Sequence, residues 1–198
     1  MCNPTDSMRY EADHKERTHQ RIVRNAARKF RAKGLNGPAV SEVMKASGLT
    51  VGGFYKHFRN KEDLLVAAIE EGLRDSEERF LPVAKTAPKG EGWKEIVKKF
   101  LSLEHCDHPE GGCPMAAMST EIARATPAVK NRVWGFMREH RDRILPFMPG
   151  ETDDEKGRKL IIAITAMNGA LAMARTMTDP KRKQQVLDAV RDHLLNTL

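Results

Sequence analysis

Apolar residues recur at helical spacing along most of this chain, and the breaks between apolar stretches fall at glycines and prolines. The first stretch predicts a helix over residues 15–33, ended by Gly34 as its C-cap. Its inward stripe follows the spacing i, i+4, i+8 in Ile22, Ala26 and Phe30. No stretch alternates with the period of two that is typical of a strand. The pattern therefore predicts an all-α protein.

Eight further helices follow from the same pattern, each bounded by residues that favour turns or caps. They are expected near residues 40–47, 51–57, 61–80, 93–103, 114–124, 127–145, 153–177 and 181–197. Pro82 is expected to end the helix that begins at residue 61, so that residues 81–92 form a loop. Residues 1–14 are expected to be a disordered N-terminal arm. Residues 15–60 and 61–198 would then form two domains.

The stretch from Val40 to Phe58, VSEVMKASGLTVGGFYKHF, has the pattern of two short helices that meet at a turn. The first helix has one inward face, made of Val40, Val43, Met44 and Ser47. Gly48 is placed to take the left-handed conformation that ends helices, and Thr50 is placed to cap the next helix.

The second short helix would pack back on the first through one apolar row, namely Val51, Phe54 and Phe58. Its outward face would carry hydroxyls, a cation, an imidazole and two glycines: Thr50, Gly52, Gly53, Tyr55, Lys56 and His57. Such a face suits a partner that carries phosphates. The alternative is a plain helical hairpin whose polar face is only solvated.

The net charge of the chain lies entirely in its first 60 residues. These residues hold 12 Lys+Arg against 5 Asp+Glu, a net of +7, whereas residues 61–198 hold 22 of each kind. Such segregation indicates an N-terminal unit that binds a polyanion and a neutral remainder with another task. A surface that was merely soluble would spread its charge more evenly.

Composition also bears on where the protein works. Three cysteines, Cys2, Cys106 and Cys113, are too few for a disulfide framework, which favours a reducing cytoplasm. The N-terminus lacks the apolar core of a signal peptide. Residues 160–177 are apolar, but polar residues such as Asn168 interrupt them, and they fall short of the roughly 20 apolar residues that span a bilayer. We therefore expect a cytoplasmic protein with no membrane partner.

Three motifs resemble the TetR (tetracycline-repressor) family of bacterial transcription regulators. They are Ala26-Ala27-x-x-Phe30 with Gly34, the run from Gly48 to Phe58, and Asn60-Lys61-Glu62-Asp63-Leu64-Leu65. The resemblance covers about residues 15 to 70, and beyond them it concerns only the number, lengths and breaks of the helices. It implies a helix-turn-helix domain over residues 15–60 that binds double-stranded operator DNA. Residues 61–198 would form a ligand-binding and dimerisation domain.

The resemblance also implies roles for single residues of the second short helix. Phosphate contacts fall to Thr50, Gly52, Tyr55, His57 and Lys61. Positions that vary in the family and read bases are Val51, Gly53 and Lys56 here. Because valine and glycine offer little to a base edge, we expect Lys56, a thymine methyl against Val51 and DNA shape to share the specificity.

In a regulator of this kind, the neutral two-thirds of the chain would hold a small-molecule effector and join two subunits into a homodimer. The last two helices would form a four-helix bundle with those of the second copy, and a core within one chain is the alternative. Large apolar side chains that could line an effector pocket are Trp93, Phe100, Met115, Met118, Trp134, Phe136, Met137 and Met167. Methionine suits adaptable cavities, so the set predicts an apolar effector, although each could also be plain core.

The segment from His105 to Cys113 leaves a second kind of signal open. His105, Cys106, His108 and Cys113 are metal-ligand types, but their spacing matches no standard zinc pattern. Cys106 and Cys113 could instead be a thiol pair that senses oxidants or electrophiles. An ordinary loop with one half-buried cysteine is the third possibility. We expect no metal and no other cofactor.

Enzymes are the rival class of protein. The sequence contains no phosphate-binding glycine loop, no HExxH and no nucleophile elbow. We therefore expect a non-enzymatic, ligand-responsive transcriptional regulator, and specifically a repressor released from its operator by a small, apolar effector. A thiol-sensing regulator and a DNA-binding architectural protein without a ligand switch are the alternatives.

Overall fold

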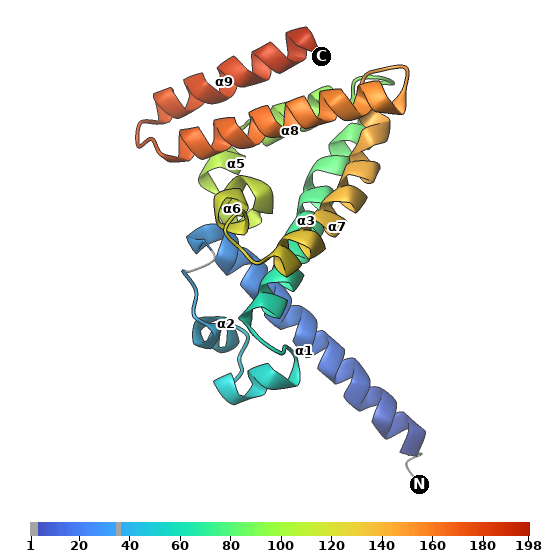
Figure 1. Cartoon of the computed structure of the whole chain (residues 1–198), viewed down its shortest axis with the longest axis vertical. Helices are drawn as coiled ribbons and strands as arrows, with labels where there is room; N and C mark the ends of the chain where they lie inside the picture. The colour runs from blue at the N-terminus through green and yellow to red at the C-terminus, as the bar shows by residue number, and fades with distance from the viewer. Residues whose placement is uncertain (1–3, 35–36) are drawn as a thin grey trace.

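The computed structural model describes residues 4–34 and 37–198, with side chains from Asp13 onward, and every regular element in these residues is helical. Figure 1 shows three tiers: α1 and α2 at one end, α3 and α7 side by side as a stalk, and α8 and α9 across the other end. Their bounds are α1 Pro4–Lys33, α2 Val40–Ala46, α3 Lys61–Thr86, α7 Pro127–Ile144, α8 Asp153–Arg175 and α9 Pro180–Thr197. This confirms the all-α prediction.

Short helices join these tiers. They are η1 Val51–Lys56, α4 Gly92–Phe100, α5 Leu103–Asp107, η2 Pro109–Gly111, α6 Pro114–Ile122 and η3 Leu145–Phe147. The second short helix of the predicted pair, η1, is a 3-10 helix, a type that the sequence pattern did not specify. The segment from residue 104 to 113, expected as a loop, contains α5 and η2. Among the described residues, no helix is both long and apolar enough to cross a membrane.

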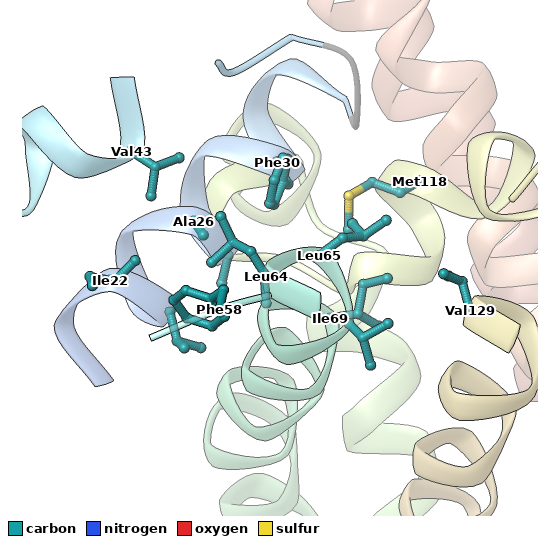
Figure 2. Close-up of a cluster of buried hydrophobic side chains, with 14 of the residues drawn as sticks. Ile22, Ala26, Phe30, Val43, Phe58, Leu64, Leu65, Ile69, Met118 and Val129 are labelled. Atoms are coloured by element: carbon teal, nitrogen blue, oxygen red, sulfur yellow. The ribbon is translucent and has the colours of Figure 1, made fainter. Parts of the chain in front are cut away.

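One hydrophobic cluster joins the N-terminal tier to the stalk. Figure 2 shows it with side chains from α1, α2, α3, α6 and α7 and with Phe58, which follows η1. The helical members include Ile22, Phe30, Val43, Leu64, Ile69, Met118 and Val129. All of these are at most 6% exposed. The core of the helical pair thus continues into α6 and α7, and the boundary predicted at residue 60 remains a prediction.

A second hydrophobic cluster lies between the stalk and the C-terminal tier. It contains Phe80 and Ala84 of α3, Trp93 and Phe100 of α4, and Leu160, Met167 and Leu171 of α8. Leu187 and Leu194 of α9 are also fully buried in it, so these apolar side chains of α9 pack within this chain. Since α3 contributes to both clusters, it connects the two ends of the molecule.

The disordered arm predicted for residues 1–14 is wrong for residues 4–14, which continue α1 as helix. Pro4 stands at the first position of α1, where its missing N–H costs no hydrogen bond. The following residues include no glycine or proline before Gly34, and they are rich in residues that tolerate a helix. Residues 1–3, with Cys2, lie outside the described residues.

The helix end predicted at Pro82 is also wrong, because α3 continues through it to Thr86. Proline removes one N–H, which leaves the carbonyl of Glu78 without its donor. Glu78 and Pro82 are both exposed, so water can satisfy that carbonyl. Ala84 is 4% exposed and packs closely on Gly92. This packing beyond Pro82 compensates for the lost bond.

We expect Gly48→Ala to destabilise the fold by about 1–2 kcal/mol, because Gly48 has φ +70° and an alanine there would be strained. A Cβ at Gly48 would meet nothing within 4 Å, so the effect isolates the backbone. Gly135→Ala is the matched control, since its Cβ would also meet nothing, but within α7. It should stabilise by up to about 1 kcal/mol. Denaturant unfolding measures both, and equal stabilities would contradict the argument.

Candidate nucleic-acid interface and ligand cavity

The turn between α2 and η1 is held by a hydrogen-bond network with α1. The buried Ser47 hydroxyl donates to the carbonyl of Val43 over 2.9 Å and accepts from Asn25 Nδ2 over 3.0 Å. The same amide donates to the carbonyl of Ala46 over 3.2 Å. Gly48 follows with φ +70°, as the sequence predicted. Because α1 anchors the end of α2, it also fixes where η1 begins.

The inner face of η1 is aromatic. Phe54 and Phe58 are 3% and 6% exposed and stack with their ring centroids 5.5 Å apart. Val51, expected in the same row, is 50% exposed. It is the first residue of η1, one turn before Phe54, and no core side chain covers it. Val51 therefore lies with the residues expected to read bases, and the prediction that it packs inward is wrong.

The outer face of η1 presents most of the predicted contact residues to solvent. Tyr55 is 76% exposed, and Thr50, Gly52, Lys56 and Lys61 are also exposed, while Gly53 and His57 are half-buried. Thr50 occupies the N-cap position of η1, but its side chain makes no capping hydrogen bond, contrary to the prediction. Its hydroxyl is therefore not committed to the helix.

His57 lies near two residues of α1, His19 and Lys15, whose positions there could not be predicted from the sequence pattern. Its ring lies 5.9 Å from that of His19, and His19 stacks on Phe58 at 4.7 Å. Partial burial, followed by the charges of His19, Lys15 and Lys56, lowers the pKa of His57. A neutral imidazole at this position would meet a phosphate as a hydrogen-bond donor rather than as a cation. Lys15 adds a positive charge beside the outer face of η1.

A mostly apolar cavity of about 50 Å³ lies between α3, α4, α7 and α8. The predicted pocket residues Trp93, Phe100, Met115, Met137 and Met167 line it. The cavity is also lined by residues that were not predicted to do so, among them Phe80, Ile96, Val97, Met148, Leu160 and Ala163. Their helical spacing indicated only burial, because any core residue shows the same pattern.

Three predicted pocket residues lie elsewhere. Met118 is 1% exposed but belongs to the cluster between α1, α3 and α6. Phe136 packs against that same cluster. Trp134 is 65% exposed and lines a neighbouring groove of about 470 Å³ between α6, α7 and α8. These three residues therefore do not line this cavity, because residue type does not reveal which side of a helix meets it.

The cavity has a polar edge made of Ser76, Glu77, His140 and Asn168. Glu77 Oε1 lies 2.9 Å from His140 Nδ1, and it accepts a hydrogen bond from Arg143 Nη1 over 2.7 Å. Burial lowers the pKa of His140, although Glu77 acts in the opposite direction. Since a carboxylate only accepts, Nδ1 carries the proton.

Known proteins resemble this chain both in its helix-turn-helix region and over most of its length. Residues 22–68 match the model of "Bacterial regulatory proteins, tetR family". An uncharacterized HTH-type transcriptional regulator of Mycobacterium tuberculosis is 25% identical over 191 residues, which cover 90% of this chain and 93% of that protein. The crystal structure of a TetR transcriptional regulator from Chloroflexus aurantiacus superposes with a TM-score of 0.74 at 26% identity. It covers 93% of this chain and 95% of that one.

The chain belongs to the TetR family. Members of this family are helix-turn-helix transcriptional regulators and not enzymes, so the protein is a DNA-binding transcriptional regulator. A regulator of Bacillus subtilis, YerO, is 30% identical over 88 residues, but the match spans 44% of this chain and only 30% of YerO. AibR, solved in complex with isovaleryl coenzyme A and operator DNA, shares the fold at 18% identity with a TM-score of 0.60, covering 89% of this chain and 97% of AibR.

In this TetR protein, His105, Cys106 and Cys113 are buried in the fold. His105 Nδ1 donates to the carbonyl of Phe100 over 2.7 Å, and its Nε2 accepts the N–H of Cys113 over 3.3 Å. Because Nε2 accepts a hydrogen bond, the imidazole is neutral, and burial lowers the pKa of His105 to about 4. Cys106 and Cys113 are 1% and 7% exposed, and burial raises the pKa of both thiols. Within the described chain, no group of three ligand residues could hold a metal ion.

Three arginines, each from a different helix, donate hydrogen bonds to the backbone of this same segment. Arg31 of α1 donates to the carbonyl of Glu110 over 2.8 Å and to Asp75 of α3 over 2.6 Å. Its side chain is 1% exposed. Arg79 of α3 donates to the carbonyl of Gly111 over 3.3 Å.

Arg175 of α8 completes the set by donating to the carbonyls of His105 and Cys106, each over 3.0 Å. The segment ends at Cys113, which also lines the cavity. The cavity wall and α1 are therefore joined through one hydrogen-bonded segment, which we call the arginine-held segment (residues 105–113).

We expect His105 to weaken the fold in acid. Its pKa is about 4 when folded and about 6.5 when unfolded, so the unfolded state binds the proton first as the pH falls. The contribution is complete above about pH 6.5 and is lost down to about pH 4, to a total of about 3 kcal/mol. Urea unfolding between these values should show a shallower pH dependence for His105→Gln. The exposed His14→Gln should follow the parent protein, and a parallel His105→Gln curve would contradict the assignment.

Proposed function

We propose that this protein is a repressor whose operator binding is released by a small, mainly apolar effector bound in the cavity between α3, α4, α7 and α8. The observation that carries the proposal is that α3 reaches from Lys61, beside η1, to Phe80 in the cavity wall. A ligand that binds one arrangement of these helices more tightly shifts the population toward it. AibR, which was solved with an acyl-CoA and operator DNA, supports the combination of ligand and DNA in this fold.

On the DNA side, we propose that Thr50, Gly52, Tyr55, His57 and Lys61 contact phosphates. The exposed Val51, Lys56 and the half-buried Gly53 would face the bases. A Cβ at Gly52 would meet nothing, so the backbone can approach the DNA closely. Lys15 of α1 adds a cation near His57, which supports phosphate binding on the same side.

The arginine-held segment supports a route from the cavity to α1. A ligand that displaces Cys113 or Met115 from the cavity wall would move the backbone to which Arg31 donates. Arg31 is too well enclosed to follow by a change of rotamer alone. A shift of the segment would therefore be passed to α1, which fixes the start of η1.

Two copies are proposed to associate through α8 and α9. On α8, Ile161, Ile162 and Met173 are 64%, 55% and 58% exposed, although the opposite face of this helix is buried in the chain. Large apolar side chains that are exposed together on one helix mark an interaction surface. A dimer also places two recognition helices roughly 34 Å apart on one face of the DNA.

Thiol sensing receives no support from the cysteines, because burial makes both thiols poor nucleophiles.

An architectural protein would bind DNA without a ligand response. Selection of an operator from random DNA, followed by a screen of small molecules for release, distinguishes it from a repressor. Release by no compound would contradict the proposal.

We expect Lys61→Ala to weaken binding to the selected operator and to random DNA by similar factors. The slope of log K against log salt should fall by about 1 for each phosphate contact removed. Lys56→Ala should instead change the sequence preference. Lys89→Ala is the control, because Lys89 is exposed beyond the opposite end of α3. Fluorescence anisotropy at several salt concentrations measures all three, and an unchanged slope for Lys61→Ala would refute its assignment.

We expect Ile162→Glu to dissociate the dimer, since a carboxylate would be buried against an apolar surface without a counter-ion. Sedimentation should then show the 22.3 kDa monomer. Ala123→Glu, at an exposed position that follows α6, should leave the dimer intact. A parent protein that sediments as a monomer would refute the dimer itself.

A further inference from the structure

The polar edge of the cavity offers acceptors that lack donors. Asn168 Oδ1 is buried and has no hydrogen-bond partner among the described residues. His140 donates from Nδ1 to Glu77, so Nε2 of the neutral ring is an acceptor. No donor from the described part of the chain bonds this Nε2. Two acceptors at the rim of an apolar cavity favour a ligand that brings a donor.

The charges around the cavity are already balanced. Glu77 is the acid of its lining, and it pairs with Arg143 over 2.7 Å as well as with His140. Among the described residues that line the cavity, none is lysine or arginine. An anionic ligand would therefore lie near the Glu77 carboxylate, and no cation in the lining would balance the charge of the ligand. A cationic ligand would compete with Arg143 for Glu77. The balance favours an uncharged ligand.

The size of the cavity indicates a small ligand. Its volume of about 50 Å³ is below the roughly 150 Å³ of a cavity that holds benzene, so a ring requires some side chains to move. Four of the lining residues are methionines, which adapt easily: Met115, Met137, Met148 and Met167. Met115, Met137 and Asn168 also line the groove between α6, α7 and α8. These residues thus lie between the cavity and an opening to solvent.

We propose that the cavity binds an uncharged molecule with a small apolar body and one hydroxyl group, of the class of monocyclic phenols and short branched alcohols. Its hydroxyl donates to Asn168 Oδ1, and the apolar body lies among the methionines, Phe80 and Phe100. Ethers and ketones of the same size can accept from Asn168 Nδ2 or the Ser76 hydroxyl, but they leave Asn168 Oδ1 without a donor and therefore bind more weakly. Carboxylates are disfavoured by Glu77. This inference rests on the proposed effector function of the same cavity.

The test is calorimetric titration of the full-length protein, without DNA, with two pairs of probes. Phenol should bind about tenfold or more tightly than anisole, and 2-butanol more tightly than 2-butanone, because only the first of each pair has a donor. Benzoate should not bind. Equal affinity within both pairs, or tighter binding of benzoate, would overturn the inference.

Asn168→Leu keeps the size of the side chain and removes the acceptor. It should weaken phenol about tenfold and leave anisole unchanged or tighter, so that the preference disappears. Asn131→Leu, at an exposed position of α7, is the matched control and should keep the preference. If Asn168→Leu does not fold, the wild-type probe pairs still decide. A folded Asn168→Leu that retains the full preference for phenol would overturn the role of Asn168.

Operator release separates this inference from the proposed function. If phenol binds with the expected preference but never weakens operator binding, the hydroxyl site stands and the effector-controlled switch fails. If no hydroxylated probe binds while a ligand of another class releases the operator, the switch stands and this inference fails.

Discussion

The structure depends on one unbroken helix, α3, which belongs to two hydrophobic clusters at once. Its first half, with Leu64 and Ile69, packs with α1 and α2, and its second half, with Phe80 and Ala84, packs with α4 and α8. At 26 residues it is about 39 Å long. Close-packed side chains resist small displacements, so a tilt imposed at one end is carried by the backbone hydrogen bonds to the other. The same helix therefore supports η1 and forms a wall of the cavity.

The arginine-held segment adds a second connection that does not pass along α3. Hydrogen bonds from a guanidinium have fixed directions, and the side chain of Arg31 is 1% exposed, so it has little freedom to choose other partners. The segment is also fixed from within by His105, whose ring occupies the space that a side chain at Gly112 would need. The cavity wall at Cys113 is thus joined to α1 by directional bonds as well as by packing.

Local chemistry made the turn of the helical pair predictable, whereas the cavity depends on distant residues. Gly48 and the pair Phe54 and Phe58 act within a few residues, and the structure has them as the sequence indicated. The continuation of α3 through Pro82 depends on packing at Ala84, which no local rule contains. Likewise Glu77 and His140 are 63 positions apart, and only the pairing of α3 with α7 brings them together. Asn168 did appear as a polar break in an apolar stretch, but the sequence could not show what it faces.

Unsatisfied polar atoms mark where this fold departs from its most stable arrangement. Among the described residues, the buried side-chain atoms without a partner are Arg31 Nη1, His57 Nδ1, Asn168 Oδ1 and Arg175 Nη1. Each such atom costs about 1–3 kcal/mol relative to a satisfied one. They lie beside η1, at the cavity edge and in the arginines around residues 105–113, rather than in the interiors of the two clusters. At each of these three places, a new hydrogen-bond partner or a changed arrangement would satisfy the unpaired atom and lower the free energy of the protein. For a regulator, that is the physical condition under which binding at one place can alter another.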